Sequence, residues 1–163
     1  MGNLCMNHLM LIYDADLAFM PACTFVNGVK KGDVTMCQVL DSFPYDGEIY
    51  LISVTGEELL NVVNRTLSEP LLKDKLPSLS DNVSVHVSGS EVVSMTIDGK
   101  DIDPNGTYTA VTNSFMMNRI MDLPKDRIID NVGLQRWILI TAFELKDPIT
   151  QEMVGGDRYI FDS

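Results

Sequence analysis

The histidines, cysteines and carboxylates are the residues that could hold a catalytic metal ion, because a metal-dependent hydrolase needs several of them converging on one site. The chain has only two histidines, and they lie on different predicted elements. His8 lies on an apolar helix, where a histidine hydrogen-bonded within the core is the more common outcome. His86 alternates with valines on a strand and is expected to face solvent or a second layer. The sequence therefore predicts no metal and no other cofactor in this chain.

Nucleophilic and phosphate-binding motifs are also absent from the sequence. The segment VSGSE (87–91) has a serine on each side of a glycine but lacks the second glycine of a nucleophile elbow. Neither a P-loop nor a dinucleotide fingerprint is present. Two closely spaced aspartate pairs lack the glycine and the terminal glutamate of a calcium loop, which favours solvated turns. These are Asp14, Asp16, Asp101 and Asp103. We expect no catalytic residue, and thus a binding or structural domain.

Chain length and net charge further restrict the classes of protein and partner that are possible. The chain has 163 residues, of which 45% are hydrophobic, and this predicts one globular domain over residues 1–163. Its formal net charge is -11, from 23 acidic and 12 basic residues. This excess of negative charge argues against nucleic acid or an anionic membrane as a partner. No segment reaches the ~18 apolar residues of a membrane span, and no signal peptide is recognisable at the N-terminus.

The three cysteines carry no recognisable pairing or metal-binding pattern. Cys5, Cys23 and Cys37 are odd in number and lack a C-x-x-C spacing, which argues against a disulfide framework and against a zinc finger. Each cysteine has apolar neighbours, and free cysteines are among the residues most often buried. We therefore expect three buried thiols.

Helical and strand patterns follow one another through the first half of the chain. The clearest unit begins with the nearly unbroken apolar run over 48–54, which is typical of a strand covered on both faces. A helix follows this run, and Thr55 and Glu58 have the spacing of a capping box at its start. Thr35 and Asn3 are candidate N-caps of two further helices. The predicted elements are a helix over 3–13, a strand over 15–20, a helix over 35–43, a strand over 48–54 and a helix over 56–68.

Strand signals dominate the second half until the final helix. Asp98-Gly99 and Asn105-Gly106 are turn dipeptides between β-rich segments, which predicts an antiparallel meander. A polar, proline-marked connection over 69–81 precedes it. The predicted elements are strands over 83–88, 91–97 and 107–115, a helix over 131–145 closed by Pro148, and a strand over 158–162. This succession, without regular βαβ alternation, indicates an α+β fold with a mixed, mainly antiparallel sheet and packed helices.

Five segments keep a defined order and spacing from residue 2 to about residue 117. They read GNLCMNHLM, ADLAFM, GDVTMCQVLDSFPYDGEIYLISVTGEELL, VSVHVSG and VSMTIDGKDIDPNGTYTAVTNSF. Together they resemble the C-terminal domain of the 5'-nucleotidase and 2',3'-cyclic-phosphodiesterase family. The family pattern runs through G-N-L-x-x-D-A, A-D-I-A-x-x-N, P-F-x-N, L-T-G-x-x-L, Q-V-S-G and Y-x-V-A-T-x-x-F. The resemblance rests on this order and spacing rather than on any single motif.

The resemblance implies the same fold and a division of labour. In that family, a separate metallophosphatase domain holds two divalent metal ions and performs hydrolysis, while the C-terminal domain captures the nucleoside between two aromatic rings. The implied partner is a metallophosphatase domain or chain, and the implied ligand is a nucleoside or nucleotide. The first ring corresponds to Tyr45, and the second to Phe115, seven residues after Tyr108. The family also suggests a periplasmic or extracellular location.

The chain departs from the family pattern at three polar positions. The residues Met20–Phe25 stand where the family has N-G-G-G-I-R, so Phe25 replaces a substrate-binding arginine and brings neither its charge nor its donors. Gly47 replaces the asparagine of P-F-x-N. The late G-G-D-G loop is missing, and Asp122 is an approximate counterpart of its aspartate. The resemblance thus implies a substrate-binding domain that is divergent at its loops, with Asp122 as a further candidate contact.

Two alternatives remain open for the rings and for the function. Tyr45 and Phe115 either stack on a flat base, at roughly 1–3 kcal/mol per stack, or pack in the core. The fold either binds a substrate or serves as an interaction or scaffold module that no longer binds nucleotides. The lost polar residues favour the second function, as would an exposed apolar patch. That patch would comprise Pro21, Ala22, Cys23 and Phe25.

Overall fold

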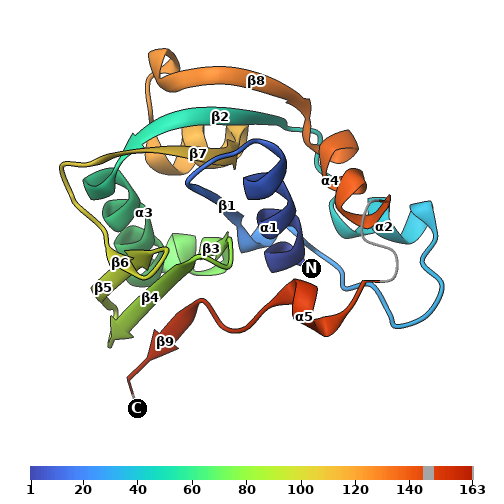
Figure 1. Cartoon of the computed structure of the whole chain (residues 1–163), viewed down its shortest axis with the longest axis horizontal. Helices are drawn as coiled ribbons and strands as arrows, with labels where there is room; N and C mark the ends of the chain where they lie inside the picture. Colours follow the sequence, from blue (N-terminus) through green and yellow to red (C-terminus); the bar gives the residue numbers. More distant parts are fainter. Residues whose placement is uncertain (145–148, 163) are drawn as a thin grey trace.

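The computed structural model describes residues 1–144 and 149–162 (Figure 1). The α-helices are α1 (Gly2–Ile12), α2 (Met36–Ser42), α3 (Gly56–Ser68), α4 (Gln135–Glu144) and α5 (Gln151–Val154). The short 3₁₀ helices are η1 (Ala22–Thr24), η2 (Pro70–Lys75) and η4 (Lys125–Arg127), and η3 (Met116–Met121) is a π-helix. The strands are β1 (Leu17–Pro21), β2 (Glu48–Thr55), β3 (Pro77–Leu79), β4 (Val83–Ser88), β5 (Glu91–Ile97), β6 (Lys100–Asp101), β7 (Thr107–Asn113), β8 (Ile128–Leu134) and β9 (Tyr159–Phe161).

The described strands form a five-stranded and a four-stranded sheet. The larger sheet has the order β3-β1-β7-β2-β8, in which β1 and β7 are parallel and all other neighbours are antiparallel. The smaller sheet has the order β6-β5-β4-β9, in which β4 and β9 are the parallel pair. In Figure 1 the smaller sheet lies at the lower left, below β2 and β8. This mixed, mainly antiparallel arrangement with packed helices confirms the predicted α+β fold.

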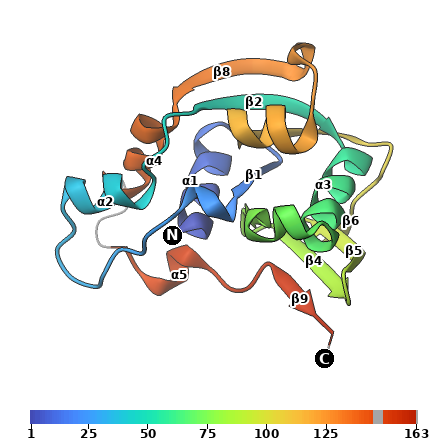
Figure 2. The ribbon, with the colours of Figure 1, turned by 180° about the vertical axis from the view of Figure 1, so that it is seen from behind.

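β2 is buried on both faces, as its apolar run predicts. Tyr50, Ile52 and Val54 belong to one hydrophobic cluster, which includes residues of α3, η3 and the smaller sheet. Ile49 belongs to a second cluster, which includes residues of α1, α2 and α4, and the half-buried Leu51 packs against it. In both Figure 1 and Figure 2, α3 lies at one end of the molecule, and α2 and α4 lie at the other. Successive side chains of β2 therefore contribute to two different cores.

Reciprocal caps start two of the helices. Thr55 Oγ1 accepts a hydrogen bond from the Glu58 N–H, and the Glu58 carboxylate accepts one from the Thr55 N–H, at 2.7 Å. Thr35 and Gln38 form the same pair of bonds at the start of α2. Both predicted threonine caps are confirmed, and they satisfy backbone donors that the helices leave unpaired. α1 has no side-chain cap, so the prediction that Asn3 caps it is wrong.

The segment that precedes α4 is a strand rather than helix. Of the helix predicted over 131–145, the structure forms only the part from Gln135 to residue 144, and β8 occupies the first four positions. Residue 145 and Pro148 lie outside the described residues. β8 pairs antiparallel with β2, and Gly133 within it has a φ of +121°, which no helix contains. The pairing with a distant strand decides the conformation here, and the local apolar pattern carries no sign of that strand.

The predicted meander is divided between the two sheets. β4, β5 and β6 are antiparallel neighbours, but β7 lies in the larger sheet between β1 and β2. β7 ends at Asn113, two residues before the predicted end. The connection predicted over 69–81 contains η2 and the short edge strand β3. Turn dipeptides indicate where a strand ends, but the burial of the next strand decides which sheet receives it.

The cysteines differ in their burial. Cys5 is buried as predicted, but Cys23 is half-buried and Cys37 is exposed, so the prediction of three buried thiols is wrong. Cys37 lies on α2, which turns Val39 and Ser42 inward and leaves the cysteine on its outer side. Burial raises the pKa of the Cys5 thiol to about 12, so this thiol stays protonated and unreactive at neutral pH.

Candidate ligand-binding site

Tyr45 and Phe115 lie at the same end of the larger sheet. Tyr45 lies just before β2, Phe115 lies just after β7, and the antiparallel register aligns the start of β2 with the end of β7. The neighbouring residues are in contact, because a Cβ added to Gly47 would lie 3.2 Å from Ser114 Oγ. Ser114 Oγ also accepts a hydrogen bond of 3.2 Å from the Glu48 N–H. Strand pairing therefore brings together two loops that are far apart in the sequence.

Both rings are exposed at this end of the sheet. Tyr45 is 55% exposed and Phe115 is 42% exposed, and neither ring belongs to either hydrophobic cluster. Such exposure does not fit the alternative in which the two rings pack in the core. It leaves aromatic surface on two adjacent loops, which is the arrangement that stacking on a flat ligand requires. The role of the two rings in binding stays a prediction.

A buried polar cluster lies beside the two ring-bearing loops. Asn113 Nδ2 donates to Gln135 Oε1 at 2.9 Å and to Thr24 Oγ1 at 3.3 Å, and Asn113 Oδ1 accepts from the Met116 N–H at 2.9 Å. The Gln135 N–H donates to the Gly47 carbonyl at 2.7 Å. Sequence reasoning did not single out these three side chains. They come from η1, β7 and α4, and only the fold places them together.

The segment Met20–Phe25 adds no cation to the site. Phe25 packs edge-on against Phe43, with ring centroids 6.5 Å apart. The apolar patch predicted in this segment does not form. Pro21 is buried in β1, two of the four residues are half-buried, and Ala22 alone is exposed. The segment is therefore an apolar support beneath the surface rather than a docking patch.

Asp122 lies at the far end of η3 from Phe115. Phe115 is the N-cap of this π-helix and Asp122 is its C-cap, in a left-handed conformation with a φ of +54°. The neighbours of Asp122, Met121 and Leu123, line a cavity of about 350 Å³ that α3 also borders. The six residues of η3 separate this exposed carboxylate from the ring pair. The part that Asp122 plays in ligand binding stays a prediction.

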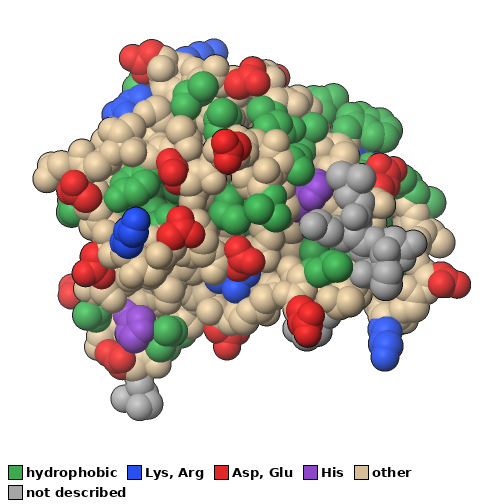
Figure 3. All heavy atoms as spheres, viewed as in Figure 1, with side chains coloured by type: hydrophobic (Ala, Val, Ile, Leu, Met, Phe, Trp, Pro, Cys, Tyr) green, Lys and Arg blue, Asp and Glu red, His purple; other side chains and the backbone are tan. Residues whose placement is uncertain are grey.

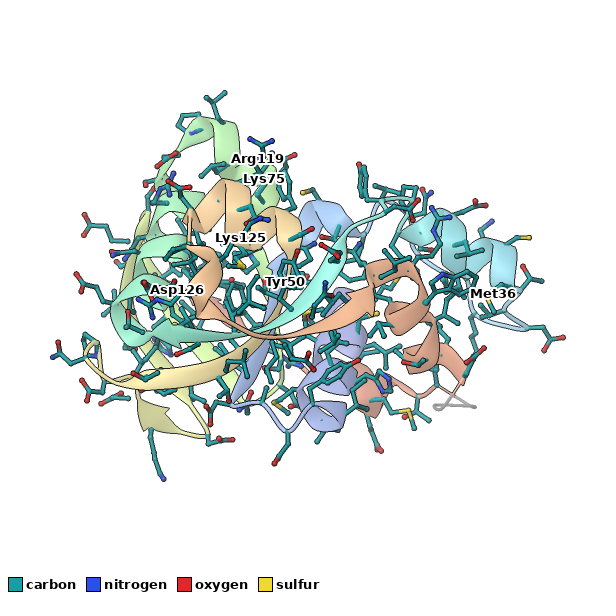
Figure 4. All side chains as sticks on the ribbon, turned by 90° about the horizontal axis from the view of Figure 1, so that it is seen from above. Met36, Tyr50, Lys75, Arg119, Lys125 and Asp126 are labelled. Atoms are coloured by element: carbon teal, nitrogen blue, oxygen red, sulfur yellow. The ribbon has the colours of Figure 1, made fainter. Side chains whose placement is uncertain are left out.

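Three cations lie on the side of the larger sheet that carries η3. Figure 4 labels them as Lys75 at the end of η2, Arg119 on η3 and Lys125 at the start of η4. Lys75 pairs with Asp74, with a 2.7 Å separation between Nζ and the carboxylate. Arg119 and Lys125 form no ion pair with any residue that the structure describes. Carboxylates share this side, since Asp122 ends η3 and Asp126 follows Lys125 in η4 (Figure 4).

Within residues 1–144 and 149–162, no three His, Cys, Asp or Glu side chains gather into a group that could hold a metal ion. His8 Nε2 lies 2.8 Å from Thr141 Oγ1 in the interior, and His86 is exposed on β4, both as the sequence predicts. Figure 3 shows Asp and Glu side chains scattered over one face of the molecule rather than gathered. Among the described helices, none combines the length and apolar character that crossing a membrane requires.

Comparison with known proteins identifies the fold family. Residues 1–120 match the family described as 5'-nucleotidase, C-terminal domain, which is more than half of the chain. The chain belongs to this family. The resemblance inferred from motif order is thereby confirmed.

Curated relatives of this 5'-nucleotidase C-terminal domain are distant in sequence. The endonuclease YhcR of Bacillus subtilis is 25% identical over 116 residues, which are 71% of this chain and 10% of that protein. The 5'-nucleotidase of Vibrio cholerae is 26% identical over 133 residues, which are 82% of this chain and 24% of that protein. The chain thus spans between a tenth and a quarter of the length of these relatives.

A solved structure shows the same fold with low sequence identity. The 5'-nucleotidase precursor from Thermus thermophilus superposes with a TM-score of 0.84 and 15% identity, over 98% of this chain and 34% of that one. Nearly the whole described chain therefore shares the fold of a part of that protein. At this level of identity the agreement concerns the backbone arrangement, and it does not carry over the side chains of the site.

Proposed function

We propose that residues 1–163 form one substrate-binding domain of a 5'-nucleotidase-type phosphoester hydrolase, not catalytic alone, which binds the nucleoside part of its substrate. Hydrolysis would be performed by a metallophosphatase domain or a separate chain of that kind, which would carry the divalent metal ions. The family membership of the chain supports this role, as does the name of the Vibrio cholerae relative. The share of its relatives that the chain spans, a quarter or less, is consistent with further domains in the functional assembly.

The observation that carries the proposal is the exposure of two rings on adjacent loops. Tyr45 and Phe115 would stack on the two faces of the base, because both lie at one end of the larger sheet outside the hydrophobic clusters. Two aromatic stacks contribute roughly 1–3 kcal/mol each, which suffices for weak binding without a charged clamp. Arg119 and Lys125 offer positive charge to a phosphate group, and Asp122 is a further candidate contact at the end of η3.

The test is an NMR titration of the intact chain with adenosine, AMP and a sugar phosphate that has no base. We expect shifts at Tyr45 and Phe115 that saturate with adenosine and AMP but not with the sugar phosphate. Phe43, buried two residues before Tyr45, serves as an internal reference whose signals should stay in place. Absence of any shift at millimolar adenosine and AMP would contradict the proposed function.

An interaction module of the same fold is the second candidate. β8 is an edge strand of the larger sheet, and Ile129 and Leu134 on it are more than half exposed, as is Trp137 on α4. Exposed apolar side chains beside an unpaired strand edge favour contact with another protein surface. If the titration shows no ligand shift, sedimentation of the wild type and of Trp137→Ser would test self-association through this edge. An average molecular mass that rises with protein concentration in the wild type, but not in Trp137→Ser, would support self-association through this edge.

A further inference from the structure

Gln135 places a carboxamide beside the two ring-bearing loops. It is the first residue of α4, and its side chain is buried, with only 1% of the residue exposed. Its backbone N–H donates to the carbonyl of Gly47 at 2.7 Å, so α4 starts against the loop that carries Tyr45. The side chain reaches the end of β7, which leads directly into Phe115. Gln135 therefore lies behind the two exposed rings rather than on the surface.

The orientation of this carboxamide is determined by its neighbours. Asn113 Oδ1 accepts from the Met116 N–H, which requires Asn113 Nδ2 to be the group that donates to Gln135. Gln135 Oε1 is therefore the acceptor, at 2.9 Å, and Nε2 is the opposite group of the same amide. Nε2 is buried and has no hydrogen-bond partner among the residues that the structure describes. A buried donor without an acceptor lowers the stability of the fold, and such donors are rare in folded proteins.

Gly47 makes room for this amide. A Cβ at position 47 would lie 3.4 Å from Gln135 Oε1 and 3.2 Å from Ser114 Oγ, so a side chain there would compete with the carboxamide for space. The backbone of Gly47 is not in the left-handed region, so the glycine is not required by conformation. The absence of a side chain at this position leaves space next to the carboxamide of Gln135 and the hydroxyl of Ser114.

We propose that Gln135 Nε2 is the hydrogen-bond donor that pairs with the edge of a flat heterocycle stacked on Tyr45 and Phe115. This inference rests on the proposed function and specifies its ligand class. The heterocycle must present an in-plane acceptor, which is a ring nitrogen or a carbonyl oxygen. Entry of the ligand edge between the loops gives the unpaired donor its acceptor. Sites that hold such a donor reject analogues that lack the matching acceptor.

The test compares wild type with Gln135→Leu, which removes the amide at similar volume. We expect the affinity for adenosine, measured by NMR titration, to fall about three- to tenfold, as the loss of one neutral hydrogen bond predicts. The 1-, 3- and 7-deaza analogues of adenosine each replace one acceptor nitrogen with C–H. One of them should bind wild type as weakly as adenosine binds Gln135→Leu, and should lose nothing further in the variant. Asn61→Leu, which removes an exposed amide on α3, is the matched control.

A transfer of the amide tests the position directly. Gln135→Ala alone should lose affinity, and the double variant Gly47→Asn/Gln135→Ala should regain it, because the asparagine side chain enters the space that Gln135 vacates. Gly47→Asn alone should bind less well than wild type, since the two amides then compete. Thermal melts and amide spectra of all variants show whether they are folded, so a loss of affinity is not mistaken for unfolding.

The outcomes separate this inference from the proposed function. If wild type and Gln135→Leu bind adenosine equally, Gln135 Nε2 has no ligand partner and the inference is wrong, while the proposed function stands. If all three deaza analogues bind wild type as well as adenosine does, Gln135 Nε2 does not donate a hydrogen bond to a ring nitrogen, and the inference is overturned for adenosine. If wild type shows no shift with adenosine or AMP, the proposed function fails, and the inference fails with it.

Discussion

The phenol of Tyr50 donates a hydrogen bond of 2.5 Å to Glu48 Oε2, two residues earlier on the same face of β2. Asn131 Nδ2 donates to the other carboxylate oxygen at 2.9 Å and so ties β8 to β2. The hydrogen bond to Glu48, followed by burial, raises the pKa of Tyr50 to about 12. The hydrogen bonds from Tyr50 and Asn131 lower the pKa of Glu48. The pair therefore favours a neutral phenol beside an ionised carboxylate across a wide pH range.

Tyr50 should make the stability of the protein depend on pH in the alkaline range. Its folded pKa lies above the unfolded value of about 10, so its contribution is complete below pH 10 and is lost as the pH rises towards 12. We expect the melting temperature to fall over this interval in wild type and to fall less in Tyr50→Phe. Thermal melts at several pH values, with tyrosinate absorbance recorded in parallel, measure both effects. Equal pH dependence in the two proteins would contradict the prediction.

The exposed rings should be dispensable for folding. Tyr45→Ala and Phe115→Ala remove side chains that lie outside both hydrophobic clusters, so each should change the free energy of unfolding by no more than about 1 kcal/mol. Phe43→Ala is the matched control, because Phe43 is fully buried and packs on Phe25. The control should lose about 3–5 kcal/mol. Urea unfolding compares the three, and losses as large as that of the control in both ring variants would place the rings in the core.

Gly56 is required by close packing at the start of α3. A Cβ at this position would lie 2.1 Å from the backbone carbonyl oxygen of Asp103, which cannot move as a flexible side chain can. Gly56→Ala should therefore destabilise the fold by about 1–3 kcal/mol or more. Gly28→Ala is the control, since a Cβ there meets nothing within 4 Å. We expect the control to melt at or slightly above the wild-type temperature, because alanine restricts the unfolded chain. If Gly56→Ala has the same melting temperature as wild type, the prediction is refuted.

Arg158 should hold the C-terminal strand in place. Its buried guanidinium donates to the carbonyls of Gly156 and Leu79 and to Asn7 Oδ1, at 2.7, 3.4 and 3.3 Å. Arg158→Met removes these buried hydrogen bonds and should cost about 3 kcal/mol. The local readout is hydrogen exchange of the Val85 N–H, which donates to the Arg158 carbonyl at 2.8 Å and should lose protection.

Lys100→Met is the control for Arg158→Met, because Lys100 is exposed on β6 and makes no ion pair with any described residue. It removes the same charge without removing buried hydrogen bonds. Its stability and the protection of β4 should stay at wild-type values. If both variants lose stability equally, the effect comes from net charge and not from the buried contacts of Arg158.

Local patterns were sufficient where the deciding interactions are themselves local. The apolar run of β2 and the capping box formed by Thr55 and Glu58 depend on residues within a few positions of one another, and the structure contains both as predicted. Motif order was sufficient for the family, because it reports the succession of elements rather than any one contact. The α+β class follows from the same succession.

Only the tertiary structure decided the features that depend on a distant partner. Residues 131–134 have an apolar pattern that suits a helix, but hydrogen bonding to β2 makes them part of β8. The exposure of Tyr45 and Phe115 depends on where the strand ends meet, which no spacing in the chain reveals. The same holds for Gln135, because its buried amide is held by Asn113 and lies next to Gly47, and both neighbours are far away in the sequence. Sequence determines which surfaces of each element are apolar, and packing then decides which of them become buried and which polar groups come together.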